Sequence, residues 1–158
     1  LSKMKKKGID INYITLDIGL GTFGPIRNEN FKHHIMHSER VSIDEETANK
    51  INIALDTDSK IIAIGTTVLR CLESVYKKFG KLKQYEVDTD LFIYPGYKLE
   101  VVDTLLTNFH LPKSSLFLLV CAFGGTQNLK LAYNHAIDLN YKFFSYGDAM
   151  LINRLDEK

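Results

Sequence analysis

Apolar residues along the chain recur with strand-like and helix-like periods in turn. Residues 1–7 have the character of a helix end that stops at Gly8, and the alternation over 14–18 predicts a strand with one buried face. The continuous apolar run 61–64 predicts a strand covered on both faces. Further short strands are predicted at 91–94, 99–102 and 141–144.

Helical spacing separates these strands. Ser42 and Glu45 form a capping box, and the apolar residues that follow it up to Leu55 recur at helical intervals. Further helices are predicted at 67–80, 115–123 and 128–139, the first two closed by glycine. Strands that alternate with helices predict an α/β fold with a mixed, largely parallel sheet flanked by helices. We find no linker or repeat, so residues 1–158 are expected to form a single α/β domain.

Composition narrows the class of protein only slightly. With 158 residues, 45% of them hydrophobic and 25% charged, the chain suits one globular domain with a sizeable core. The net charge of +1 neither requires nor excludes a nucleic-acid partner. Lysines gather at 3–7 and again at 77–83, where solvated helix ends explain them more simply than phosphate contacts do.

The remaining compositional features favour a cytoplasmic protein outside the membrane. Cys71 and Cys121 lie in apolar runs without metal-ligand spacing, as expected of two reduced, buried thiols. The longest apolar run, 116–123, is far shorter than the ~20 residues of a membrane span, and we see no signal peptide. Because the chain begins inside a helical pattern, we expect it to be a fragment.

A glycine-rich loop follows the first predicted strand. Gly19, Gly21 and Gly24 have the spacing of a dinucleotide-binding fingerprint, which would make the protein a nucleotide-cofactor oxidoreductase. That fingerprint needs its third glycine inside an opening helix, whereas Pro25 follows here and no apolar helical stripe comes after it. The loop is better interpreted as a tight turn that lets the backbone approach a ligand.

Polar groups that could take part in catalysis or binding occur in four further places. His34, His37 and Glu39 lie close in sequence, where acid–base chemistry is a better functional hypothesis than metal binding and a hydrogen-bonded loop is the structural alternative. Arg70 falls in an apolar helical stretch and needs an anion, either Glu73 or Asp90 or a ligand carboxylate. The last two places are the polar stretch 107–114, whose Ser114 or the following Ser115 could cap a helix, and Asp148, which binds a ligand or caps the final segment.

Several segments in this order resemble the S-adenosylmethionine:tRNA ribosyltransferase-isomerase family of queuosine biosynthesis, over about residues 7–152. The matching segments are 19–23, 34–39, 65–74, 92–97, 102–103, 107–114, 122–125 and 143–150. Two departures stand out: Asp17 occupies a position where the family usually has histidine, and the family's N-terminal segment and inserted β-barrel domain are absent from this chain.

The resemblance implies a transferase that moves and isomerises the ribosyl unit of S-adenosylmethionine onto a deazaguanine at the tRNA wobble position. Adenine and methionine leave, and an epoxycyclopentane forms. That reaction requires a base beside the sulfonium, for which His37 or Glu39 is the candidate, and a proton donor to the departing adenine, for which His110 is the candidate. The implied substrate-binding residues are Gly19, Gly21, Thr22, Phe23, Thr66, Arg70, Asp90, Asn108, Lys113, Tyr146 and Asp148.

The resemblance also implies the partners. These are S-adenosylmethionine as the ribosyl donor and tRNA bearing a queuosine precursor. No metal and no further cofactor are needed, and the protein is expected to be a cytoplasmic monomer. A truncated, inactive remnant that keeps the fold is the second alternative, beside the oxidoreductase.

Overall fold

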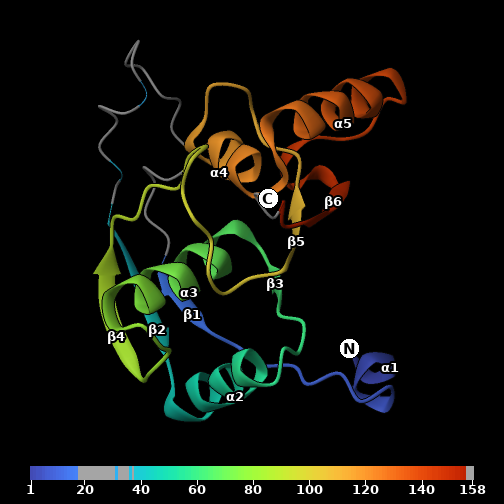
Figure 1. Ribbon diagram of the computed structural model, residues 1–158. Helices are drawn as coiled ribbons and strands as arrows, with labels where there is room; N and C mark the ends of the chain where they lie inside the picture. The colour runs from blue at the N-terminus through green and yellow to red at the C-terminus, as the bar shows by residue number, and fades with distance from the viewer. Residues whose placement is uncertain (18–30, 32–35, 37, 156–158) are drawn as a thin grey trace.

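The computed structural model describes residues 1–17, 31, 36 and 38–155 (Figure 1). The helices are α1 (Ser2–Lys6), α2 (Glu45–Asp56), α3 (Thr66–Phe79), α4 (Ser115–Gly124), α5 (Thr126–Asp138) and the short 3-10 helix η2 (Phe144–Tyr146). The strands are β1 (Thr15–Asp17), β2 (Glu39–Ile43), β3 (Ile62–Ile64), β4 (Tyr85–Thr89), β5 (Thr104–Asn108) and β6 (Ala149–Asn153).

One sheet is antiparallel, with the strand order β1-β2-β4. β2 alternates strictly, so that Glu39, Val41 and Ile43 are buried on one face. On the other face Arg40 lies opposite Asp88, and its Nε is 3.4 Å from the carboxylate. Side chains in β2 therefore alternate between the core and the outer face, where Arg40 and Asp88 are paired.

The second sheet is mixed, with the order β3-β5-β6. β3 and β5 run parallel, whereas β6 returns antiparallel to β5. Ala63, Leu105 and Ile152 lie in register and form a buried row. The parallel pair brings the carboxyl ends of β3 and β5 to the same edge of the sheet.

Helix α3 connects the two sheets. It follows β3 directly and contacts β3, β4 and β5, and Figure 1 shows it crossing the space between the sheets. Leu69, Leu72 and Val75 give it an apolar face that is buried in the core. Its end is fixed by Gly80, which adopts a left-handed conformation with φ 68°.

Helices α4 and α5 meet at a sharp bend. Ser114 caps α4 by accepting a hydrogen bond from the backbone N–H of Phe117, and Gly125 ends that helix at φ 85°. A Cβ on Gly124 would lie 2.5 Å from Ile152, so only glycine allows this approach to β6. Among the described residues no single helix is long and apolar enough to cross a membrane; α4 and α5 qualify only as a pair, and they are bent by 114°.

The mixed α/β class and the predicted helices are confirmed, but parallel pairing does not predominate. Among the described strands β3–β5 is the one parallel pair, and the other three pairs are antiparallel. The strands expected at 91–94, 99–102 and 141–144 are wrong, because the ladders form instead at β4, β5 and β6. The alternation of the true strands is weak because polar residues stand in their buried rows, as Glu39 does in β2 and Thr107 does in β5.

Two finer predictions are also wrong. The N-cap of α2 is Asp44, whose carboxylate accepts a 2.7 Å hydrogen bond from the N–H of Thr47, and Ser42 belongs to β2. β3 is not covered on both faces, because Ile62 and Ile64 are 52% and 57% exposed. Leu151, which lies in the same row as Ile64, is 68% exposed on that face.

The cap of α2 gives a direct test. Asp44→Ala removes an acceptor for an orphan helix N–H and should lower the free energy of unfolding by about 0.5–2 kcal/mol. Ser42→Ala is the matched control and should change it by less than about 0.5 kcal/mol. Urea unfolding of both variants measures the difference. A larger loss of unfolding free energy for Ser42→Ala would instead support Ser42 as the N-cap.

Candidate functional site

The carboxyl ends of β3 and β5 bring several of the predicted site residues together. Ile64 lies in register with Leu106, and the N–H of Gly65 donates a 2.9 Å hydrogen bond to the carbonyl of Leu106. Thr66 and Asn108 therefore follow at neighbouring strand ends. Open α/β sheets bind ligands at such an edge.

His110 lies just beyond the end of β5. Its Nε2 is 3.1 Å from the hydroxyl of Thr107, and its backbone N–H donates a 2.8 Å hydrogen bond to the hydroxyl of Tyr133. Burial lowers the pKa of His110 to about 4, because the charged imidazolium would lose its hydration there. At pH 7 this side chain is consequently a neutral imidazole.

Asn108 joins the strand end to the segment before β6. Its side-chain amide donates a 3.0 Å hydrogen bond to the carbonyl of Asp148. The carboxylate of Asp148 accepts a 2.6 Å hydrogen bond from the N–H of Lys142 and so closes the loop between these two residues. Asp148 thus adjoins the strand-end site through its backbone, while its carboxylate is engaged within its own loop.

A buried ion pair forms the second part of the site. Arg70 Nη1 lies 2.5 Å from the carboxylate of Glu39, with the two side chains 2% and 0% exposed. Arg70 Nε donates a 3.1 Å hydrogen bond to the carbonyl of Leu91, whereas Nη2 has no partner within the described residues. Burial lowers the pKa of Arg70, and the charge of Glu39 opposes that shift.

The partner of Arg70 is therefore Glu39, rather than Glu73 or Asp90. Asp90 is exposed and contributes only charge attraction at longer range. Thr66 and Arg70 are four residues apart on α3, so they share one helix face, and both are buried. The first turn of α3 thereby links the strand-end residues to the ion pair.

The other predicted residues are scattered or fall outside the described part. Lys113 is exposed ahead of α4, with φ 59°, and Tyr146 is 79% exposed on η2. Gly19, Gly21, Thr22, Phe23 and His37 lie outside the described residues. Among the residues that the structure describes, no group of three His, Cys, Asp or Glu side chains could hold a metal ion.

Sequence reasoning missed the role of Glu73. This buried residue of α3 accepts hydrogen bonds from the backbone N–H groups of Glu100 and Val101, both 3.0 Å long. Burial raises the pKa of Glu73, and the backbone hydrogen bonds oppose that shift. A glutamate on the apolar face of a predicted helix was the available signal. A buried glutamate of this kind needs hydrogen-bond donors, which the backbone N–H groups of Glu100 and Val101 supply.

The fold defines a mixed α/β protein, with Thr66, Asn108 and His110 forming a candidate ligand site at the carboxyl ends of its parallel strands. The family model described as "Queuosine biosynthesis protein" matches residues 1–152, and the chain belongs to this family. The resemblance seen in the sequence is thereby confirmed.

Curated proteins and a solved structure resemble the chain over nearly its whole length. Proteins named S-adenosylmethionine:tRNA ribosyltransferase-isomerase from a Psychrobacter species and from Buchnera aphidicola are 50% and 52% identical, over 98% and 96% of this chain. The chain covers 40% and 43% of those relatives. The crystal structure of S-adenosylmethionine tRNA ribosyltransferase from Thermotoga maritima matches with a TM-score of 0.78 and 38% identity, over 96% of this chain and 47% of that one. The chain thus spans less than half the length of these relatives.

The buried ion pair should be costly to break from one side. Arg70→Met leaves the buried carboxylate of Glu39 without this cation and should lower the free energy of unfolding by about 3–5 kcal/mol. The double variant Glu39→Leu/Arg70→Met should recover most of that loss, because neither charge is then buried. Arg40→Met, which removes an exposed cation from the same strand, is the control and should cost less than about 1 kcal/mol. If Arg70→Met and Arg40→Met lowered the free energy of unfolding equally, the assignment of a buried Arg70–Glu39 ion pair would be contradicted.

The low pKa of His110 makes stability depend on pH. In the unfolded chain the imidazole titrates near its ordinary value of 6.5, and in the folded chain near about 4. As pH falls from 7 to 5 the unfolded state gains this proton first, so stability falls by about 2 kcal/mol through this group. His110→Gln should remove that part of the pH dependence, whereas His135→Gln, an exposed control on α5, should retain it. Urea unfolding at both pH values measures it, and an unchanged dependence in His110→Gln would refute the assignment.

Proposed function

We propose that the chain is the α/β part of an S-adenosylmethionine:tRNA ribosyltransferase-isomerase. It would transfer and isomerise the ribosyl unit of S-adenosylmethionine onto 7-aminomethyl-7-deazaguanine at the tRNA wobble position and so form epoxyqueuosine. The observation that carries the proposal is the family match over residues 1–152, together with relatives of that name at 50–52% identity. The donor acts as a substrate, and no further cofactor is invoked.

The chemistry assigns distinct tasks to the two halves of the site. Proton removal beside the sulfonium needs a base, for which His37 and Glu39 remain the candidates. The carboxylate of Glu39 is buried and already occupied by its ion pair with Arg70, so it is less accessible to a substrate proton. His37 is therefore the better candidate, with Glu39 holding Arg70 in position.

Arg70 is proposed to bind the carboxylate of the methionine moiety. Its Nη2 has no acceptor within the described residues, so one donor of the planar guanidinium remains for a ligand.

His110 is proposed to bind the departing adenine. As a neutral imidazole it can donate an N–H hydrogen bond to a purine nitrogen without carrying charge.

The wider setting follows from the same proposal. The partners are tRNA with a queuosine precursor and S-adenosylmethionine, and the protein acts as a cytoplasmic monomer. An inactive remnant that keeps the fold is the second candidate.

Ligand-induced stabilisation tests the proposal. S-adenosylmethionine at about 100 times its Kd should stabilise the chain by about 2.7 kcal/mol and raise Tm by about 5–10 °C. NAD(H) should leave Tm unchanged, and a shift with NAD(H) alone would instead support the oxidoreductase. We expect residues 1–158 to bind the donor with little or no transfer to substrate tRNA, since the relatives carry further segments. Robust transfer by the chain alone would contradict that expectation and exclude the inactive remnant.

A further inference from the structure

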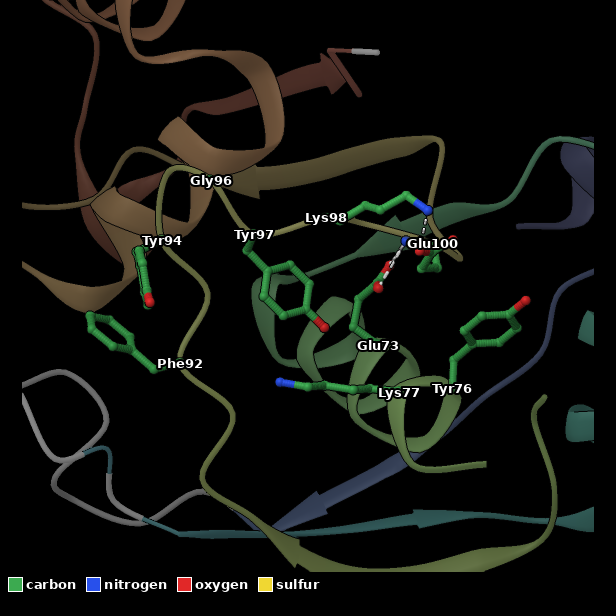
Figure 2. A pocket seen from close by; sticks show the side chains of 9 residues that line it. All are labelled: Glu73, Tyr76, Lys77, Phe92, Tyr94, Gly96, Tyr97, Lys98 and Glu100. Atoms are coloured by element: carbon green, nitrogen blue, oxygen red, sulfur yellow. Dashed lines mark hydrogen bonds and ion pairs between the residues drawn. The ribbon is translucent and has the colours of Figure 1, made fainter. Parts of the chain in front are cut away.

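A hollow beside α3 is lined by aromatic rings that the strand-end site does not use. It has a volume of about 710 Å³, and Figure 2 shows it between α3 and the segment that carries Phe92, Tyr94 and Tyr97. The rings of Phe92 and Tyr94 lie 5.2 Å apart, tilted at 51° to each other. A cavity of this size with several rings suits a flat ligand of nucleoside size.

The hollow is held open by a buried carboxylate. Glu73 accepts the backbone N–H groups of Glu100 and Val101, which fixes the segment after Tyr97 against α3. Figure 2 shows Glu73 reaching that segment from α3, with the ring of Tyr97 beside it. The rings of Phe92, Tyr94 and Tyr97 form the aromatic wall of the hollow. Because the backbone is held in this way, the wall is pre-formed, and binding a ligand costs less conformational entropy.

The charges around the hollow favour an anionic ligand. Lys98 forms a 2.8 Å ion pair with Glu100, and the carboxylate of Glu73 is occupied by backbone donors. Lys77 is different: its ammonium lies 5.6 Å from the ring centroid of Tyr97, and no ion pair to it occurs within the described residues.

We infer that this hollow binds a nucleotide of single-stranded RNA, with the base on the aromatic wall and its phosphate on Lys77. The inference rests on the proposed function, which makes RNA the acceptor, and it assigns the RNA contact to a surface outside the strand-end site. Lys77 is exposed and flexible, so its ammonium can leave the ring of Tyr97 for a phosphate. S-adenosylmethionine fits less well, because its two cationic groups outweigh its single carboxylate and Lys77 would repel it on balance.

Binding of a dye-labelled, unstructured hexaribonucleotide to the 158-residue chain tests the inference. Fluorescence anisotropy at several salt concentrations separates stacking from charge. Tyr97→Leu keeps an apolar side chain but removes the ring, and it should weaken binding about 5- to 150-fold with an unchanged salt slope. Lys77→Gln should reduce the slope of log K against log[salt] by about 0.7, the value for one phosphate contact on a single strand.

Matched controls use exposed residues elsewhere in the chain. Tyr13→Leu and Lys130→Gln should leave affinity and salt slope unchanged. Lys77→Gln alters only an exposed side chain and keeps the test decisive should Tyr97→Leu unfold. Failure of the chain to bind the oligonucleotide would overturn the inference. So would variants Tyr97→Leu and Lys77→Gln that bind it with the same affinity and salt slope as the unaltered chain.

The donor substrate provides the arm that separates this inference from the proposed function. Tyr97→Leu should retain the Tm increase given by S-adenosylmethionine, because the strand-end site is intact. Displacement of the oligonucleotide by S-adenosylmethionine, or loss of that Tm increase in Tyr97→Leu, would assign the hollow to the donor and refute the RNA contact. A normal Tm increase without oligonucleotide binding would leave the proposed function standing and remove only this inference.

Discussion

The buried contact between Arg70 and Glu39 determines how the two sheets are arranged. Arg70 belongs to α3, which leaves the mixed sheet directly after β3, whereas Glu39 opens β2 of the antiparallel sheet. The same guanidinium binds the carbonyl of Leu91, just after β4. One side chain therefore fixes a helix from one sheet to two segments of the other. Two charges without water between them also require a defined geometry, since a displaced pair would lose attraction without regaining hydration.

Position along α3 then decides what each part of the helix can do. Its first turn carries Thr66 to the strand-end edge, its second turn carries Arg70 to Glu39, and Glu73 in the next turn binds the backbone at Glu100. These side chains recur at intervals of three or four residues, the spacing at which helical residues share a face. The candidate strand-end site at one end of α3 and the proposed RNA-binding hollow along its flank thus adjoin one helix.

The sequence predicted helices and chemistry better than it predicted strands. The apolar spacing of α3 and α4 identified both helices, and the isolated Arg70 was correctly taken to need an anion. β2 was missed because its buried row begins with the charged Glu39 and has only two apolar members, Val41 and Ile43. Conversely, the run 91–94 looked like a strand because of its apolar and aromatic residues. Three of these, Leu91, Phe92 and Tyr94, are only partly buried, and no ladder forms there.

Which carboxylate meets Arg70 was equally beyond the reach of sequence. Glu39 is thirty-one positions away and Glu73 is three, yet the nearer one turns toward backbone donors. Local spacing cannot rank partners that the chain brings together only after both sheets have formed. The glycine loop and His37 stay predictions, since they lie outside the described residues.

The open face of the mixed sheet has a thermodynamic consequence. Ile62, Ile64 and Leu151 remain more than half in contact with water, so unfolding hydrates little additional apolar surface at these positions. The heat-capacity change of unfolding comes chiefly from such hydration and is usually about 12–15 cal/mol/K per residue. A sheet packed on one face contributes less than that, which flattens the curve of stability against temperature. Cooling consequently weakens this chain less than it would weaken a protein of equal length with both sheet faces covered.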